Sequence, residues 1–279
     1  MIMQCISPLN IPRPNGRGNA DRVVVPCGKC MACLSKARSH WSYRLKQELK
    51  SCSSAFFVTL TYDDDHLFFN NFGVPSVNKE HIQLFFKRLR KYYYGNSKSD
   101  IRYFLSSEYG PNTSRPHYHG IFFNIPDDFE GVQKQILNCW SHGHVHVGTV
   151  TGASIGYVAK YCVSKSFVPE DADKVFSLMS RRPGIGANYL TSQVKEWHGA
   201  DSGDKYFVVG DGGVKQSMPR YYRDKIFSKE SQEARDVFVP KLVDPVKYKG
   251  SIPISLYEMQ LKEDYSRRVA NSINKTSKL

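Results

Sequence analysis

Hydrophobic and polar positions along the middle of the chain follow two different periods. A helical period begins after Asn78, which stands where a capping residue is expected. Its apolar positions lie three or four residues apart: Ile82, Phe85, Phe86, Leu89 and Tyr93. The run 55–62 is rich in β-branched and aromatic residues, which is typical of a buried strand. We expect further strands at 101–107, 117–124 and 143–150, and further helices at about 129–140 and 153–166.

The order of these elements is strand, helix, strand, strand, helix, strand, and then one more helix. It matches the split βαββαβ unit of RRM-like folds. The fold class that we predict is therefore α+β, with a central antiparallel sheet and helices on one face. We expect the other face to be open to DNA and metal.

The regions before and after this core have different residue patterns. Residues 31–50 have the pattern of a basic amphipathic helix whose apolar residues point to the core: Leu34, Trp41, Leu45 and Leu49. Beyond Val168 we expect a hairpin at 206–218 and a helix at about 255–275. The predicted division of the chain is a cysteine-rich segment with a basic helix at 1–50, a core at 51–168 and a basic C-terminal α/β extension at 169–279.

The charge of the chain favours a polyanionic partner. Lys and Arg total 39 against 26 acidic residues, which gives a formal net charge of +13. Nucleic acid is the leading candidate, and a merely solubilising surface is the alternative. The candidate DNA-binding residues lie on the second predicted helix, in turns and in the extension: Lys87, Arg88, Arg90, Arg115, Arg181, Arg182, Arg220 and Arg223.

Nothing in the sequence indicates a membrane partner. There is no run of 18 apolar residues, and residues 1–10 lack the features of a signal peptide. We therefore expect a cytoplasmic protein, whose thiols stay reduced.

Four of the seven cysteines occur within the first 33 residues. Cys27, Cys30 and Cys33 form a Cys-x-x-Cys-x-x-Cys run, and Cys5 precedes it. This spacing lets thiolates converge on zinc or on an iron–sulfur cluster, and we favour zinc with all four. The alternative is that only two or three point together and packing holds the loop.

Two histidines, His117 and His119, stand two residues apart in a predicted strand. Residues i and i+2 of a strand point to the same face, so the two imidazoles begin a metal site. In the predicted hairpin Glu108 lies opposite His117, and cross-strand partners share a face. The alternative is an ordinary surface or core pair. His142, His144 and His146 also alternate on a strand, but they lack an acidic residue nearby in the sequence.

A third motif lies in the helix after the last predicted strand. Tyr157, Lys160 and Tyr161 fall on one helical surface at i, i+3 and i+4. Two phenols beside a metal form a pair of candidate nucleophiles, and Lys160 is placed to stabilise a phenolate. The alternative is that one tyrosine reacts and the other stacks on a base.

Together, His117-Tyr118-His119 and Tyr157-Val-Ala-Lys160-Tyr161 resemble the HUH endonucleases that initiate rolling-circle replication. The similarity is to the replication initiators of microviruses, and Cys27-Gly-Lys-Cys30-x-x-Cys33 and Arg182-Pro-Gly-Ile-Gly are similar to the gokushovirus branch. The resemblance covers about residues 25–190. The middle residue of the histidine motif is tyrosine rather than apolar, and we expect Tyr118 to face away from the metal.

The resemblance implies a metal-dependent endonuclease acting on single-stranded origin DNA. His117, His119 and Glu108 would hold Mg²⁺ or Mn²⁺, and a tyrosine would form a 5′-phosphotyrosine and release a 3′-OH. No phosphate-binding ATPase loop is present in the sequence, so host helicase, polymerase and single-strand-binding protein would be partners. The alternatives are a transposase or relaxase of the same superfamily and a non-catalytic zinc-containing DNA-binding protein.

Overall fold

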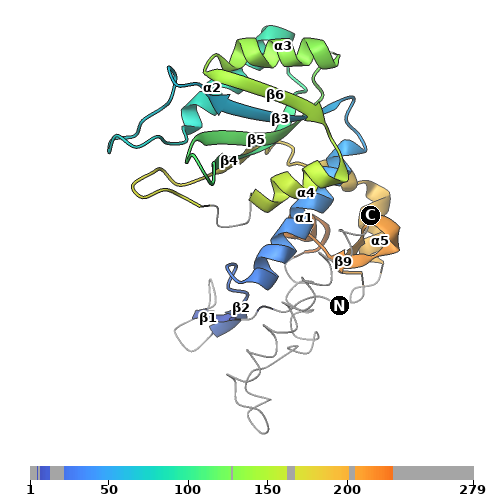
Figure 1. The fold of residues 1–279 in the computed structure, drawn as a ribbon. Helices are drawn as coiled ribbons and strands as arrows, with labels where there is room; N and C mark the ends of the chain where they lie inside the picture. The colour runs from blue at the N-terminus through green and yellow to red at the C-terminus, as the bar shows by residue number, and fades with distance from the viewer. Residues whose placement is uncertain are drawn as a thin grey trace, which may run out of the picture. The chain divides into compact units, whose positions relative to one another are not determined.

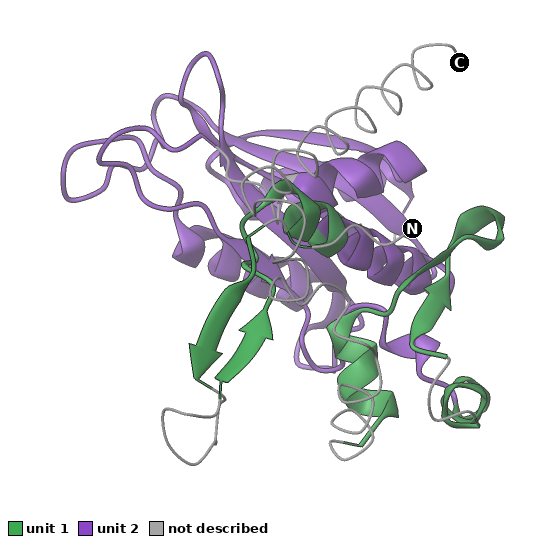
Figure 2. Ribbon diagram, turned by 90° about the horizontal axis from the view of Figure 1, so that it is seen from below, with its two compact units in different colours: residues 1–37, 192–279 green, residues 38–191 purple. Residues whose placement is uncertain are grey.

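The computed structural model describes residues 5, 7–12, 22–126, 128–161, 167–200 and 205–228, and for Tyr161 the backbone alone. The chain divides into two compact units, one of Met1–Ala37 with Ser192–Leu279 and one of Arg38–Thr191 (Figure 2). This division differs from the three segments expected from the sequence. The reason is that most of the basic helix and the strand after the tyrosine helix pack with the core sheet.

The larger unit is built on a five-stranded sheet in which every neighbouring pair is antiparallel. The strands are β3 (Ala55–Tyr62), β4 (Arg102–Tyr109), β5 (Pro116–Phe123), β6 (Gly143–Thr149) and β7 (Ser177–Met179). Their order is β6-β3-β5-β4-β7, so β5, which carries the two histidines, is central. Leaving out β7, this is the order of the split βαββαβ unit, and the predicted α+β class is confirmed.

Two helices cover the first face of the sheet, α2 (Lys79–Tyr94) and α3 (Phe129–Trp140) (Figure 1). Asn78 caps α2 by accepting hydrogen bonds from the backbone N–H groups of Glu80 and His81, as the sequence predicted. The apolar stripe of α2 is buried against alternate residues of the strands, among them Tyr118 and Phe122 of β5. This larger core fixes which face of β5 the even-numbered residues occupy, and so turns His117 and His119 to the other face.

The second face of the sheet is less open than the sequence suggested. Helices α1 (Met31–Leu49) and α4 (Gly152–Tyr161) lie on it (Figure 1). Leu45, Ile155 and Val158 pack with Phe104, Ile121 and Phe123, and Trp41 and Leu49 border this second core. The apolar positions of both amphipathic helices need a partner, and this face of the sheet supplies it. The expected free face is therefore confined to the region around the histidines.

The described part of the smaller unit includes two short ribbons, two short helices and the first residues of α1. Strands β1 (Leu9–Pro12) and β2 (Arg22–Val25) pair with each other, as do β8 (Phe207–Val209) and β9 (Lys215–Ser217). The predicted hairpin at 206–218 is thus confirmed. Helices α5 (Ser192–Gly199) and α6 (Arg220–Ile226) complete the unit, and the helix expected at 255–275 lies outside the described residues. Within the described residues, no helix is both long and apolar enough to span a membrane.

Candidate functional site

The register of the sheet brings three side chains of the histidine motif together. Glu108 of β4 pairs with His117 of β5, as the hairpin predicted. His119 stands between Ser106 of β4 and Thr59 of β3. Because odd-numbered residues of β5 share a face, both imidazoles and the carboxylate point to the same side of the sheet.

The carboxylate of Glu108 lies between the two imidazole rings. Its Oε2 atom is 3.4 Å from Nε2 of His117 and 3.4 Å from Nε2 of His119. The ligand atoms of the three residues lie within 4.8 Å of one another. Oε2 of Glu108 is buried and accepts no hydrogen bond within the described part of the chain. A buried carboxylate oxygen without a donor is costly, and a cation between these atoms would remove the cost.

In each imidazole ring, the partner of Nδ1 decides which nitrogen carries the proton. The other nitrogen, Nε2, then has a lone pair that faces the carboxylate. Nδ1 of His117 is 3.0 Å from the carbonyl oxygen of Arg115, so this nitrogen carries the proton. Nδ1 of His119 is 3.0 Å from the hydroxyl oxygen of Thr59, which can accept in the same way. Both Nε2 atoms are then available as ligands, with their rings held in place.

Burial keeps the His119 ring neutral. Loss of hydration lowers the pKa of His119 to about 4, and the neighbouring His117 lowers it further while the Glu108 carboxylate opposes the shift. A neutral imidazole is the form that binds a metal. The set of one carboxylate oxygen and two imidazole nitrogens therefore fits a divalent cation.

Helix α4 brings a tyrosine to this set. Two hydrogen bonds hold the start of this helix. The backbone N–H of Thr151 donates to Ser154 Oγ at 2.7 Å, and the backbone N–H of Ser154 donates to Thr151 Oγ1 at 3.2 Å. The helix buries Ile155, Val158 and Ala159, which leaves Tyr157 on a partly exposed side. The Tyr157 hydroxyl is 3.4 Å from Nε2 of His119, and its ring meets the His119 ring edge-on at a centroid distance of 5.1 Å.

The other two members of the tyrosine motif follow on the same helix. Lys160 is exposed, one turn from Tyr157. Tyr161 is the last residue of α4, and its side chain lies outside the described part of the structure. The structure thus brings Tyr157 to Glu108, His117 and His119, and gives for Tyr161 only the position on the helix.

Tyr118 faces away from the two histidines, as predicted. Its hydroxyl accepts a hydrogen bond of 2.7 Å from the backbone N–H of Asn78 and lies 2.9 Å from the hydroxyl of Tyr62. Tyr62 in turn contacts Nδ1 of His81 at 2.9 Å. The middle residue of the histidine motif therefore links β5 to the start of α2 through hydrogen bonds.

Sequence reasoning missed two residues next to this site. Thr59 orients His119, and its only sequence signal is its place on the same face of β3 as Phe57. Arg38 of α1 approaches α4 at Gly156, where its Nη2 atom is 3.2 Å from the point that a Cβ atom would occupy. Glycine at 156 thus leaves room for the Arg38 guanidinium next to α4.

Among the described residues, the other three histidines of this region do not join the group of metal ligands. His142 turns to the first face of the sheet, where its ring stacks on His81 at 4.4 Å. His144 and His146 are exposed on the edge strand β6, opposite Thr61 and Thr59. The three residues therefore do not share a face, contrary to the expectation from alternation.

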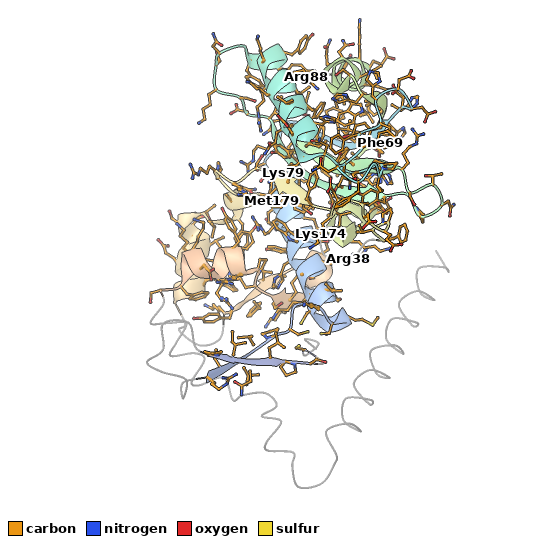
Figure 3. All side chains as sticks on the ribbon, turned by 90° about the vertical axis from the view of Figure 1, so that its left-hand side faces the viewer. Arg38, Phe69, Lys79, Arg88, Lys174 and Met179 are labelled. Carbon is orange, nitrogen blue, oxygen red and sulfur yellow. The ribbon has the colours of Figure 1, made fainter. Side chains whose placement is uncertain are left out.

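Several of the candidate DNA-binding residues make contacts within the protein. Arg88 of α2 donates to the carbonyl oxygens of Cys139 and Trp140 (Figure 3). Arg115 donates to the carbonyl oxygen of Tyr62 at 2.7 Å and pairs with Asp64. Arg220 and Arg223 both pair with Asp224, and Lys87 is exposed on α2.

Arg90, Arg181 and Arg182 come together in a cavity of about 820 Å³ in the larger unit. Lys98 and Arg102 also line it, so five cations face two acids, Glu48 and Asp100. Arg102 is held by Glu48 and by the carbonyl oxygens of Pro183 and Gly184. The cavity lies at the opposite end of β4 from the histidines, since Arg102 pairs with Phe123 and Glu108 with His117.

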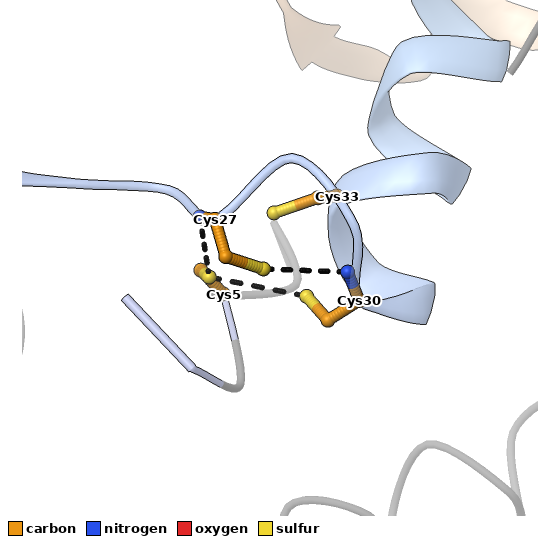
Figure 4. Close-up of side chains that lie close together, drawn as sticks. All are labelled: Cys5, Cys27, Cys30 and Cys33. Carbon is orange, nitrogen blue, oxygen red and sulfur yellow. Dashed lines mark hydrogen bonds between the residues drawn. The ribbon is translucent and has the colours of Figure 1, made fainter. Parts of the chain in front are cut away.

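The four N-terminal cysteines form a second cluster, in the smaller unit (Figure 4). Backbone N–H groups of Lys29 and Cys30 point at the sulfur of Cys27 and lower the pKa of its thiol to about 6. This cluster and the histidine cluster are the two groups of potential metal ligands among the described residues.

Comparison with known proteins gives a consistent result. Residues 55–167 match the model of the replication-associated protein ORF2 family. The chain is 35% identical over 227 residues to replication-associated protein ORF2 of Spiroplasma virus 4, covering 75% of this chain and 69% of that protein. It is 31% identical over 268 residues to replication-associated protein VP4 of Bdellovibrio phage phiMH2K, covering 89% and 79%. Replication-associated protein ORF4 of Chlamydia phage 1 is 28% identical over 232 residues, covering 75% and 55%. No solved structure matches the chain.

Proposed function

Because the chain belongs to the replication-associated protein ORF2 family and its relatives come from small phages, we propose that it initiates rolling-circle replication by cutting single-stranded origin DNA with a tyrosine. The observation that carries the proposal is the 3.4 Å approach of the Tyr157 hydroxyl to Nε2 of His119, next to the Glu108 carboxylate. A nucleophile beside a set of metal ligands is the arrangement that phosphoryl transfer needs.

Glu108, His117 and His119 would hold the divalent cation, Mg²⁺ or Mn²⁺. Two imidazole nitrogens favour Mn²⁺ in vitro, and abundance favours Mg²⁺ in cells. When bound, the cation would withdraw negative charge from a non-bridging oxygen of the scissile phosphate. Thr59 and the carbonyl oxygen of Arg115 keep both rings turned towards that position.

The reaction would form a bond between the Tyr157 oxygen and phosphorus, and break the bond between phosphorus and the 3′ oxygen. The phenol loses its proton and the departing 3′ oxygen gains one, so the products are a 5′-phosphotyrosine and a 3′-OH. A phenol has a pKa near ~10, so a positive neighbour assists its ionisation. Lys160 on the same helix and Arg38 beside Gly156 would supply such a positive charge.

Tyr161 would supply the second nucleophile. It follows Tyr157 by four residues on α4, and such positions are about 5–6 Å apart between Cβ atoms. The phosphotyrosine bond keeps the energy of the phosphodiester, so a later 3′-OH can displace it without ATP. Two tyrosines in turn could cut the regenerated origin and rejoin the old end.

DNA would also contact the basic cavity at the far end of β4. Arg90, Lys98, Arg181 and Arg182 line it together with serine and asparagine side chains, a composition suited to phosphates. The protein would act in the infected host cell, with host helicase, polymerase and single-strand-binding protein as partners.

The test is covalent capture. The protein is incubated with Mn²⁺ and labelled single-stranded fragments of its own replicon, and denaturing gels reveal protein joined to DNA. We expect an adduct on one fragment, its loss in the Tyr157→Phe/Tyr161→Phe double variant, and its retention in Tyr92→Phe, which changes an exposed tyrosine of α2. An adduct that survives in the double variant overturns the nucleophile assignment. Tight binding without any adduct, in the presence of Mn²⁺, overturns the proposed cleavage.

A further inference from the structure

The four cysteines of the smaller unit converge on one point, although they come from separate parts of the chain. Cys5 precedes β1, Cys27 and Cys30 lie in the turn between β2 and α1, and Cys33 is in the first turn of α1. Their sulfur atoms all lie within 4.8 Å of one another (Figure 4). From this geometry we infer that Cys5, Cys27, Cys30 and Cys33 bind a single tetrahedral zinc ion.

The distances between the sulfur atoms fit one ion. Zn–S bonds are about 2.3 Å long, so two sulfur ligands of a tetrahedral site are about 3.8 Å apart. The sulfur atoms of Cys5 and Cys30 are 3.8 Å apart. The two sulfur atoms of a disulfide are about 2.05 Å apart, so Cys5 and Cys30 are not joined by one. In an iron–sulfur cluster the four cysteines are divided among two or more iron atoms, so their sulfurs do not all surround one ion as they do here.

The turn that carries Cys27 and Cys30 is shaped to hold thiolates. The backbone N–H groups of Lys29 and Cys30 point at the Cys27 sulfur at 3.4 and 3.3 Å. The N–H of Cys27 points at the Cys5 sulfur at 3.2 Å. Four thiolates around Zn²⁺ carry a net charge of about −2, and these donors stabilise it. Gly28 makes the turn possible because its φ of 72° is in the left-handed region.

The dipole of helix α1 also stabilises negative charge on the thiolates. It begins at Met31, directly after Cys30, and the N–H of Leu34 donates to the carbonyl oxygen of Cys30. Its first turn holds no acidic residue. The positive end of the helix dipole therefore faces Cys30 and Cys33, which take the place of the usual acidic side chains.

The surrounding segment explains why an ion is needed. Among the described residues from Cys5 to Ala37, Ala32 alone is buried. The β1–β2 ribbon has only partly buried or exposed residues, and a two-stranded ribbon is marginally stable in water. With four protein ligands the ion has no open position, so its role is structural. It would tie Cys5 and the ribbon to the start of α1.

The experiment measures metal in the full-length chain, purified under reducing conditions without added metal. Because the histidine cluster can also take zinc, the measurement is made in the His117→Ala/His119→Ala background. We expect one zinc per chain, and loss of that zinc in Cys27→Ser and in Cys33→Ser. The control is Cys52→Ser, which changes a cysteine of the larger unit whose sulfur donates to the carbonyl oxygen of Leu49. Full zinc content in both cysteine variants, or iron in place of zinc, overturns the inference.

A second measurement needs no variant of the four cysteines. The unaltered chain is alkylated with and without a strong zinc chelator, and the modified cysteines are mapped by mass spectrometry. We expect the chelator to increase modification of Cys5, Cys27, Cys30 and Cys33, with no change at Cys52. Equal modification of the four with and without the chelator, or a disulfide among them, overturns the zinc site.

Discussion

Oε2 of Glu108 lies 3.4 Å from Nε2 of His119, and this buried oxygen accepts no hydrogen bond among the described residues. The two residues come from adjacent strands, β4 and β5. Without a cation the arrangement is costly, because a buried acceptor loses its hydration and gains no donor. With a cation the same oxygen becomes a ligand. Metal binding and stability therefore respond in opposite ways when this charge is removed.

We predict that Glu108→Gln lowers the affinity for Mn²⁺ by at least about 10-fold, since an amide is a weaker ligand than a carboxylate. In metal-free protein the same change should raise the free energy of unfolding by about 1 kcal/mol, because the buried unpaired charge is gone. Calorimetric titration with Mn²⁺ and urea unfolding in chelator measure the two effects. Glu170→Gln, which changes an exposed residue in a turn of the larger unit, should alter neither. Unchanged Mn²⁺ affinity in Glu108→Gln would contradict the ligand assignment.

A second prediction concerns Tyr118, which stands between the two histidines in sequence and faces the larger core. Its hydroxyl accepts from the N–H of Asn78 and donates to the carbonyl oxygen of Asn78 at 3.1 Å. Tyr118→Phe removes both of these part-buried hydrogen bonds, so we expect a loss of about 1–3 kcal/mol in the free energy of unfolding. The affinity for Mn²⁺ should stay unchanged.

Urea unfolding and Mn²⁺ titration of the Tyr118→Phe variant check both parts. The control, Tyr92→Phe, removes an exposed hydroxyl and should change stability by less than about 0.5 kcal/mol. If Tyr118→Phe leaves the free energy of unfolding unchanged but abolishes Mn²⁺ binding, Tyr118 belongs to the metal site.

Periodicity predicted most of the larger unit because each long element has a clear apolar stripe. The expected strand 55–62 and helix 129–140 match β3 and α3 residue for residue. Strand β7 was not predicted, since Ser177–Met179 is too short to show a period and forms only by pairing with β4. The covering of the second face by α1 and α4 was also missed, because an apolar stripe does not reveal which surface it will meet.

The part of the candidate site that depends on the pairing register of β4 and β5 was predictable from the sequence. The short loop between β4 and β5 sets Glu108 opposite His117, and the period of two sets His119 on the same face. The roles of Arg88 and Thr59 were not predictable, because a carbonyl oxygen of Cys139 and the ring of His119 become their partners only in the folded chain. His142 was misplaced because it lies just before β6, where strand alternation does not apply.

A third prediction follows from the stacked rings of His81 and His142, 4.4 Å apart between centroids. Burial lowers the pKa of both side chains, that of His142 to about 4, and the neighbouring His81 contributes to the lower pKa of His142. In the unfolded chain a histidine titrates near ~6.5. Between these values the unfolded chain binds protons that the folded chain does not, so the free energy of unfolding falls as the pH decreases.

The contribution of these two histidines to the free energy of unfolding should therefore be greatest above about pH 7 and should decrease towards pH 4. Substitution His142→Gln should make that decline shallower, as measured by urea unfolding at a series of pH values. The matched control is His146→Gln, which removes an exposed histidine from β6 and should leave the slope as it is. Equal slopes for the His142→Gln variant and the unaltered protein would contradict the assignment of this acid sensitivity to the stacked pair.

The last prediction concerns the basic cavity at the far end of β4. Arg181 and Arg182 are exposed there, whereas Arg102 in the same cavity is held by Glu48. Each phosphate contact to a single strand contributes about 0.7 to the slope of log affinity against log salt concentration. If both arginines contact phosphates, Arg181→Ser/Arg182→Ser should weaken binding of single-stranded DNA of any sequence and reduce that slope by about 1.4.

Fluorescence anisotropy over a series of salt concentrations measures both the affinity and the slope. The control is Lys134→Ser, which removes an exposed charge from α3, away from the residues that line the cavity, and should leave the slope nearly unchanged. If Lys134→Ser reduces the slope by half as much as the double variant does, the effect follows the number of charges removed and is assigned to net charge rather than to the cavity. At saturating DNA the double variant should still form the covalent adduct, because the cavity and the histidines lie at opposite ends of the same strands.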